Sequence, residues 1–252
     1  MGHRALSLNT TAASNVAVGK DALYANTTGT QNVAMGTTAL DANTTGENLV
    51  AIGYAALGAN TTANDNVAIG AFSLDANTTG TNNTAIGKIA LSANTTGDSN
   101  VAVGSASLDL NTTGSANLAF GVNALGSNTS GIRNIAIGFT ALGASTTSDY
   151  NTAIGYEAMA LNTTGTRNTA LGTQALYTNV DGDNSVAIGY EALFTQDPAS
   201  NVDMYNVAVG YAAGKAITTG VQNTLIGGLA GDSITTGSNN IIICLLYTSD
   251  AA

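Results

Sequence analysis

A glycine recurs every seventeen residues over nearly the whole chain. The series runs without interruption from Gly19 to Gly189 and, after a slip of four residues, resumes at Gly210 and Gly227. A period kept this strictly indicates one small structural unit that is stacked many times. The chain is therefore expected to fold as a regular repeat rather than as a conventional globular domain.

Aligned on its glycine, the unit reads Gly-x-x-Ala-Leu-x-x-Asn-Thr-Thr-Gly-x-x-Asn-Val-Ala-Ile, and fourteen such units lie between Gly2 and Ile243. The segment Asn-Val-Ala-Ile predicts a strand, because two large and mostly β-branched residues alternate with an alanine. The Ala-Leu pair predicts a second short strand, and Asn-Thr-Thr-Gly predicts a turn. The expected fold is an all-β, single-chain parallel β-roll or β-solenoid of about fourteen coils.

A single unit cannot bury enough apolar surface to fold alone, so neighbouring units must supply ladders of hydrogen bonds. Equivalent asparagines then lie above one another and can satisfy each other's amides. Each coil also has two apolar faces, of which only one can line its inside; packing against further copies of the chain is the simplest cover for the other. The residues expected to carry the repeat are represented by Asn32, Gly36, Asn66, Gly70, Asn83, Gly87, Asn100, Gly104, Asn134 and Gly138.

The strand motif Asn-Val-Ala-Ile-Gly at 66–70, and its Ile variant at 134–138, resembles the head repeat of trimeric autotransporter adhesins, the YadA-like heads. The pairing of 151–156 with Asn-Thr-Thr-Gly at 162–165 also resembles repeats in phage tail-fibre proteins. The resemblance covers residues 2–243. It implies a left-handed parallel β-roll, a homotrimer, and an extracellular place on a cell surface or a virion tail fibre.

Composition narrows the possible partners. The formal net charge is −10 and the acidic residues are scattered, which argues against nucleic acid as a partner. No run of eighteen apolar residues is present, so no membrane insertion is expected. One histidine, His3, and one cysteine, Cys244, supply neither a disulfide nor a metal cluster. Composition alone does not exclude paired carboxylates, but Asp41, Asp75 and Asp109 recur as surface substitutions at one position of the unit. We expect no catalytic residues, no metal, no cofactor and no enzyme.

Two segments depart from the repeat. The first is the end of the chain, where Cys244 stands in place of the next glycine and residues 244–252 fit no part of the unit. We expect a repeat domain over 1–243, as a fragment of a longer protein, and a tail over 244–252 that resembles a translated sequencing-adaptor read-through. A native capping segment is the alternative reading of this tail.

The second departure is the longer unit after Gly189, which inserts a loop, and loops on one face of a solenoid often bind. A tolerated loop expansion is the alternative. An aromatic residue also follows the repeat glycine in several units, which predicts an outward stripe suited to stacking against sugars or proteins, or simply surface packing. The candidate contact residues are Tyr54, Phe139, Tyr156, Tyr190 and Tyr211 in the stripe and Phe194, Asp197, Pro198 and Tyr205 in the loop.

The function expected from these features is a structural and adhesive fibre segment, an adhesin head or a phage tail-fibre shaft. Its partners would be other copies of itself, as a homotrimer, and a host surface glycan or protein. A monomeric ice-binding or other ligand-binding solenoid is the alternative, because threonine pairs recur in the turns. On a strand, however, adjacent residues such as Thr27 and Thr28 would point to opposite faces.

Overall fold

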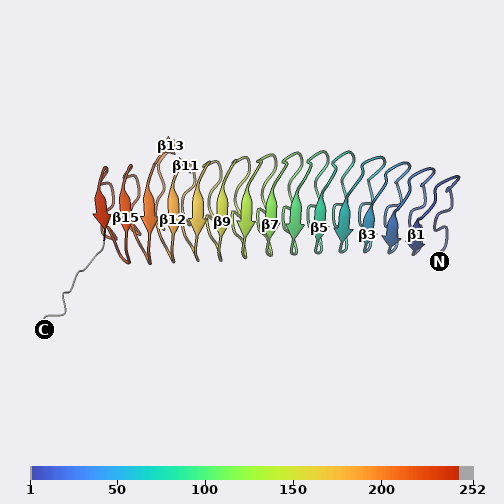
Figure 1. The fold of residues 1–252 in the computed structure, drawn as a ribbon, viewed down its shortest axis with the longest axis horizontal. Coiled ribbons are helices and arrows are strands. Elements are labelled where there is room, and N and C mark those ends of the chain that lie inside the picture. The colour runs from blue at the N-terminus through green and yellow to red at the C-terminus, as the bar shows by residue number, and fades with distance from the viewer. Residues whose placement is uncertain (1, 244–252) are drawn as a thin grey trace, which may run out of the picture. The chain divides into compact units, whose positions relative to one another are not determined.

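The protein is a parallel β-solenoid, as seen in a computed structural model that describes residues 2–243. The described residues contain strands, turns and bends but no helix. Consecutive strands pair in parallel at a spacing of about seventeen residues, which confirms the expected fold class (Figure 1). The described residues divide into two compact units, one that ends at Arg133 and one that begins at Asn134.

In the first unit each coil contributes one strand of three residues. Every strand pairs with the next so that each residue lies opposite the one seventeen positions later, as in Val33 with Val50 and Ala34 with Ala51. The strands are β1 (Val16–Val18), β2 (Val33–Met35), β3 (Val50–Ile52), β4 (Val67–Ile69), β5 (Thr84–Ile86), β6 (Val101–Val103) and β7 (Leu118–Phe120).

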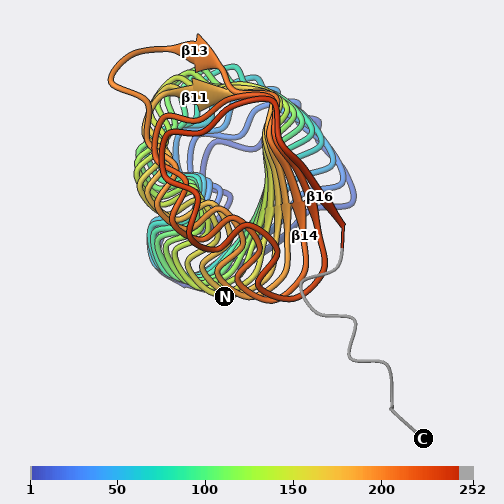
Figure 2. The same ribbon diagram turned by 90° about the vertical axis from the view of Figure 1, so that its left-hand side faces the viewer.

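The second unit repeats this arrangement with one insertion. Its strands are β8 (Ile135–Ile137), β9 (Thr152–Ile154), β10 (Thr169–Leu171), β12 (Val186–Ile188), β14 (Val207–Val209), β15 (Thr224–Ile226) and β16 (Ile241–Ile243). Between β12 and β14 the partner spacing grows, because Val186 pairs with Val207. The extra residues include β13 (Val202–Asp203), which pairs in parallel with β11 (Gly182–Asp183). Figure 2 shows these two strands together, with the loop before β13 extending outward.

The interior of each coil is lined by small and branched aliphatic residues in alternation. The middle residue of each strand points inward, so Ala34 and Ala51 are fully buried, and so are Leu40 and Leu57 from the opposite wall. Alanine allows that wall to approach closely, and the leucine then fills the remaining space. The two larger residues of each strand consequently point outward. Of the two apolar faces of the coil, the alanine face is therefore the one that lines the inside.

The prediction of a second strand at the Ala-Leu pair is wrong. In that segment two successive turns follow the repeat glycine, marked by the hydrogen bonds from Ala39 N to Gly36 O and from Asn43 N to Leu40 O. Thr38 and Leu40 both have positive φ, at 55° and 53°. This pattern recurs in nearly every coil and places non-glycine residues in a left-handed conformation. Hydrogen bonds to the next coil, such as Leu40 N to Ala56 O, hold the turns in place.

Two columns of buried asparagine join the coils. At the start of the strands, the side-chain oxygen of Asn66 accepts the backbone N–H of Asn83 at 2.9 Å, and the Asn83 amide donates to Gly97 O at 2.9 Å. In the turns, Asn43 donates to the Asn26 oxygen at 3.0 Å. The expected strand column is thus confirmed, although its amides bond mainly to backbone. The turn column shows that Asn-Thr-Thr is a structural motif with its amides inside the coil.

The repeat glycine is required on steric grounds. Gly70 has a φ of +136°, and a Cβ added there would lie 2.3 Å from the carbonyl oxygen of Gly87 in the next coil. The equivalent glycines of both units share this close approach between neighbouring backbones. The recurrence of glycine at this position of the coils therefore follows from a contact that only glycine permits. The non-repeat tail expected at 244–252, including Cys244, lies outside the described residues.

Candidate binding surfaces

The outward face of the strands is an unusually apolar surface. In the first unit Val16, Val18 and Phe120 are 49%, 45% and 55% exposed, and Met35 and Ile86 are also exposed. In the second unit the exposed residues of this face include Ile135, Leu171, Ile226, Ile241 and Ile243. A solvent-facing side of a sheet normally carries polar residues at alternate positions. Here threonine at the first position of β5, β9, β10 and β15 is the main polar replacement.

The expected aromatic stripe is most developed in the second unit. Phe139 and Tyr156 stack at 5.5 Å between ring centroids with their planes 10° apart, and Tyr190 and Tyr211 stack at 5.4 Å and 7°. All four rings are exposed. Each follows the repeat glycine of its coil, so we call this set the glycine-adjacent column. Thr173 occupies the same position in the coil between Tyr156 and Tyr190.

A second aromatic pair and a polar row lie in the same coils. Tyr177 and Phe194 stack at 5.2 Å, and the Lys215 ammonium lies 5.8 Å from the centroid of Phe194. The polar row consists of Glu157, Gln174 and Glu191, each two residues after its repeat glycine. The Gln174 amide donates to the Glu157 carboxylate at 2.8 Å.

Ionisation along this row follows from its contacts. A hydrogen bond with Glu157 raises the pKa of the Tyr156 hydroxyl, and one with Glu191 raises the pKa of Tyr190. The hydrogen bond and ion pair with Lys215 lower the pKa of Glu191. The Glu191 carboxylate therefore stays ionised, and Tyr156 and Tyr190 stay neutral, at physiological pH. The row presents oxygen acceptors beside the rings.

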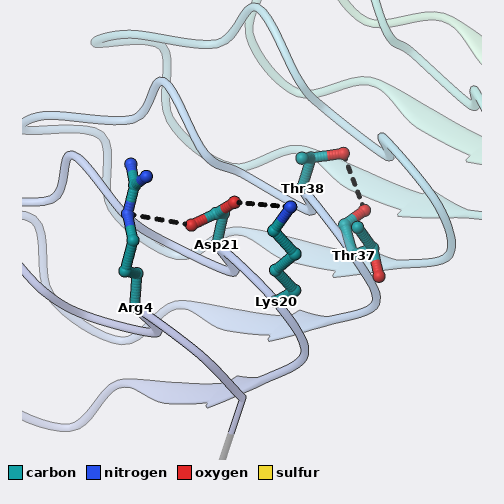
Figure 3. A network of polar contacts seen from close by, with 5 residues as sticks. All are labelled: Arg4, Lys20, Asp21, Thr37 and Thr38. Atoms are coloured by element: carbon teal, nitrogen blue, oxygen red, sulfur yellow. Dashed lines mark hydrogen bonds and ion pairs between the residues drawn. The ribbon is translucent and has the colours of Figure 1, made fainter.

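Aromatic contacts in the first unit are fewer. Tyr54 packs edge-on against Phe72 with centroids 5.0 Å apart. In the earliest coils charged groups occupy the corresponding surface. Figure 3 shows Asp21 between two cations, with one carboxylate oxygen 3.1 Å from Arg4 Nε and the other 3.9 Å from Lys20 Nζ. Beside them Thr38 donates to the carbonyl of Thr37 at 2.7 Å.

The loop inserted after Gly189 is anchored rather than loose. Met204 is fully buried, Pro198 is buried, and the carboxylate of Asp197 accepts the backbone N–H of Val180 at 3.2 Å. Tyr205 is exposed and donates to Asp203 at 3.1 Å, a contact that raises the pKa of its hydroxyl. Of the predicted loop residues, Tyr205 and Asp197 are therefore accessible, Phe194 joins the aromatic stack, and Pro198 is packed inside.

The threonine pairs lie in bends, so the expectation that they alternate as on a strand does not apply. The first threonine of most pairs bonds to the next coil, as in Thr27 Oγ1 to Thr44 O at 3.0 Å. The second, such as Thr28, Thr45 or Thr79, is exposed. Each unit therefore presents a column of outward threonines at the spacing of the coils.

Residues 2–243 contain no group of three or more histidine, cysteine or acidic side chains placed to hold a metal ion. Within the same range no helix has the length and apolar character needed to cross a membrane. No protein-family model matches the chain, and no curated protein is similar to it in sequence.

Sequence reasoning missed several residues of these surfaces. It singled out Tyr156 and Tyr190 but not Glu157, Gln174, Glu191 or Tyr177. These residues share two repeat positions, the second and the fifth after the glycine, at which the side chain varies widely from coil to coil. Comparing neighbouring coils at each position would have revealed the polar row and the second aromatic pair.

Proposed function

We propose that this chain is a segment of a homotrimeric adhesive fibre, in which the outward faces of the strands pack against equivalent faces of other copies. The observation that carries the proposal is the apolar character of those faces in both units. The number of copies, three, and the extracellular location come from the resemblance to trimeric adhesin heads and tail-fibre repeats.

Apolar side chains left in water forgo the free energy that burial in an interface would give them. Large apolar residues are exposed on β1, β2, β5 and β7 of the first unit and on β8, β10, β15 and β16 of the second, and the outward residues of the other strands of the long sheet are half-buried. Burying a fully exposed residue of this kind contributes about 1.5–3 kcal/mol when complete. Contiguous apolar surface of this kind marks an interaction site in soluble proteins. Because the surface repeats with the coil, a second copy with the same repeat matches it in spacing, as self-association by symmetry requires.

The remaining surface suits attachment. The hydrogen bonds between coils hold exposed tyrosines and threonines in fixed rows, and a rigid row loses little conformational entropy when it binds. The repetition also allows many weak contacts to act together, which raises the strength of attachment well above that of one contact.

Assembly can be tested by multi-angle light scattering of the purified chain. The expected mass is three times the 24.9 kDa of one chain. The double variant Met35→Lys with Ile86→Lys places two charges on the outward strand face and should shift the protein to monomer. Thr45→Lys with Thr96→Lys places the same charges on the threonine column and should leave the trimer intact. A monomeric wild-type protein at micromolar concentration would rule out the fibre.

Attachment itself can be tested with beads coated with the chain and passed over bacterial and animal cells under flow. Retention above that of albumin-coated beads on at least one cell type is expected. Beads that wash off every cell type at the albumin rate would contradict the adhesive role even if the trimer forms.

The exposed threonine column favours one alternative function, that of a monomeric ice-binding solenoid. A thermal-hysteresis assay tests it directly. Ice-growth inhibition by a monomer that is lost in Thr79→Lys would favour this function over the fibre.

A further inference from the structure

The glycine-adjacent column of the second unit has a missing ring. Phe139 stacks on Tyr156, and Tyr190 stacks on Tyr211, but Thr173 separates the two pairs. The coils are consecutive, because Gln174 N bonds to Tyr156 O at 2.9 Å and Glu191 N bonds to Thr173 O at 3.0 Å. One face of Tyr156 and one face of Tyr190 therefore remain without an aromatic neighbour in the column.

The gap matches the size of one ring. Two strand spacings amount to about 9.6 Å, so a ring placed over Thr173 would have its centre about 4.8 Å from each tyrosine. That separation lies within the range of about 4.5–7 Å at which stacked rings attract. Threonine is short enough to leave this position to a ligand, and the flanking tyrosines are 49% and 44% exposed.

Polar groups beside the gap fit hydroxyl groups. The carboxylates of Glu157 and Glu191 and the amide of Gln174 form a row along it, and the Tyr156 and Tyr190 hydroxyls bond to the two glutamates. Sugars combine C–H faces, which are attracted to the negative face of an aromatic ring, with a rim of hydroxyl donors. Carboxylate and amide acceptors at the edge of stacked rings complement that combination.

We propose that the gap over Thr173, between the rings of Tyr156 and Tyr190, binds one pyranose ring of a neutral oligosaccharide. The inference rests on the proposed attachment function and names the chemical class that this surface recognises. The Glu157 carboxylate disfavours sugars that carry carboxylate or sulfate groups, because like charges would lie side by side, whereas Glu191 is already paired with Lys215.

The probes are cellotetraose, maltotetraose, N-acetyl-chitotetraose and, as the anionic comparison, tetragalacturonic acid. Saturation-transfer NMR on the full chain should show transfer to at least one neutral probe and none to the anionic one. Isothermal titration then gives the affinity. Thr173→Tyr fills the gap and should weaken binding by at least about tenfold, while Tyr156→Ala and Tyr190→Ala each remove one stacking face and should weaken it by about tenfold.

Matched controls separate this site from general surface effects. Thr37→Tyr makes the same change at the same repeat position in a coil that has a ring on one side only, with Tyr54 in the next coil and Lys20 in the previous one. Tyr54→Ala removes that aromatic residue of the first unit. Both should bind the probes as the wild type does. Circular dichroism melting of each variant shows that the fold is retained.

Absence of transfer to every neutral probe would overturn the proposal, as would unchanged affinity in Thr173→Tyr. Binding that is lost equally in Thr37→Tyr would also overturn it. Light scattering on the same samples reports the oligomeric state, so that a loss of sugar binding can be told apart from a failure to form the trimer. A monomer that binds sugar through Tyr156 and Tyr190 would refute the fibre alone, whereas a trimer that binds no neutral sugar would refute the sugar site alone.

Discussion

At the scale of single residues, the solenoid depends on contacts that tolerate very little change. The repeat glycines place their Cα atoms against the next coil's backbone, and the buried asparagines connect coil to coil through side-chain and backbone hydrogen bonds. Both residue types were singled out from the period alone, because a stacked repeat brings identical residues into register. Their partners, however, depend on backbone geometry that the period does not specify.

Replacing Gly189 with alanine should lower the melting temperature by several degrees. Its φ is +134°, and the new Cβ would lie 2.3 Å from Gly210 O, so strain and backbone displacement should cost about 2–4 kcal/mol. Gly228→Ala is the matched control, since no atom lies within 4 Å of its Cβ position. Circular dichroism melting compares the two, and equal melting temperatures would contradict the steric account.

The turn asparagines give a second prediction. In Asn77→Ala the hydrogen bonds to Asn60, Gly80 and Asn94 are lost inside the coil. At about 1 kcal/mol for each bond, the variant should lose about 3 kcal/mol of stability. Thr79→Ala, on the exposed side of the same turn, should change stability by less than about 0.5 kcal/mol. Urea unfolding followed by circular dichroism measures both, and a stable Asn77→Ala would show that the column is dispensable.

Burial of an acidic group predicts a dependence on pH. Desolvation raises the pKa of Asp75, so the folded chain holds this proton more tightly than the unfolded chain. Stability from this group is therefore present below the ordinary aspartate value, about 3.9, and is lost as pH rises through the higher folded value. Asp75→Asn should melt above the wild type at pH 7, with a difference that shrinks toward pH 4. A difference that grows on acidification would reverse the assigned direction.

At the scale of the element, the strand could be predicted from sequence and the turns could not. Alternation of Val, Ala and Ile identified the strand, whereas Ala-Leu was assigned to a second strand that the structure replaces with two turns. The sequence gives little sign of those turns, because residues such as Ile89 and Leu91, rather than glycine, adopt positive φ there. Hydrogen bonds between coils override the local preference.

The core of the last coils shows a compensating exchange. Where other coils have a leucine in the turn and an alanine in the strand, the coil after Gly210 has Gly214 and Leu225. A Cβ at Gly214 would lie 2.7 Å from Leu225 Cδ1, so the leucine of the strand occupies the volume usually filled from the turn. The two positions therefore exchange volume across the coil.

A double-mutant cycle tests this exchange. Leu225→Ala should cost about 2–5 kcal/mol through the cavity that it leaves, and Gly214→Leu should cost about 1–3 kcal/mol through overpacking. The double variant restores the arrangement of the other coils and should be more stable than either single variant. Urea unfolding gives the three values, and additive losses would show that the residues do not share one space.

The candidate surfaces also include residues that the sequence predicted and residues that it did not. The aromatic stripe was anticipated at Tyr156 and Tyr190, because an aromatic residue repeatedly follows the glycine. The polar row at Glu157, Gln174 and Glu191 was not, because its members differ chemically from coil to coil. The sequence also did not decide which of the two strand faces lines the interior. That choice depends on how closely the opposite wall of the coil approaches.

At the scale of the whole molecule, we propose that the outward faces of the strands pack against the same faces of other copies of the chain. The apolar residues on those faces are unlike the polar residues expected on a solvated sheet, and contacts within the described part of either unit leave them half-buried or exposed. An assembly that buries them would make the stability of the chain depend on its concentration.

The most direct test is crosslinking from single positions on a Cys244→Ser background. Val101→Cys places a thiol on the outward strand face, and Thr96→Cys places one on the exposed threonine column of the same unit. With a short bismaleimide, Val101→Cys should give covalently linked copies on a denaturing gel and Thr96→Cys should stay single. Linked copies only from Thr96→Cys, or none from Val101→Cys at micromolar concentration, would contradict the account.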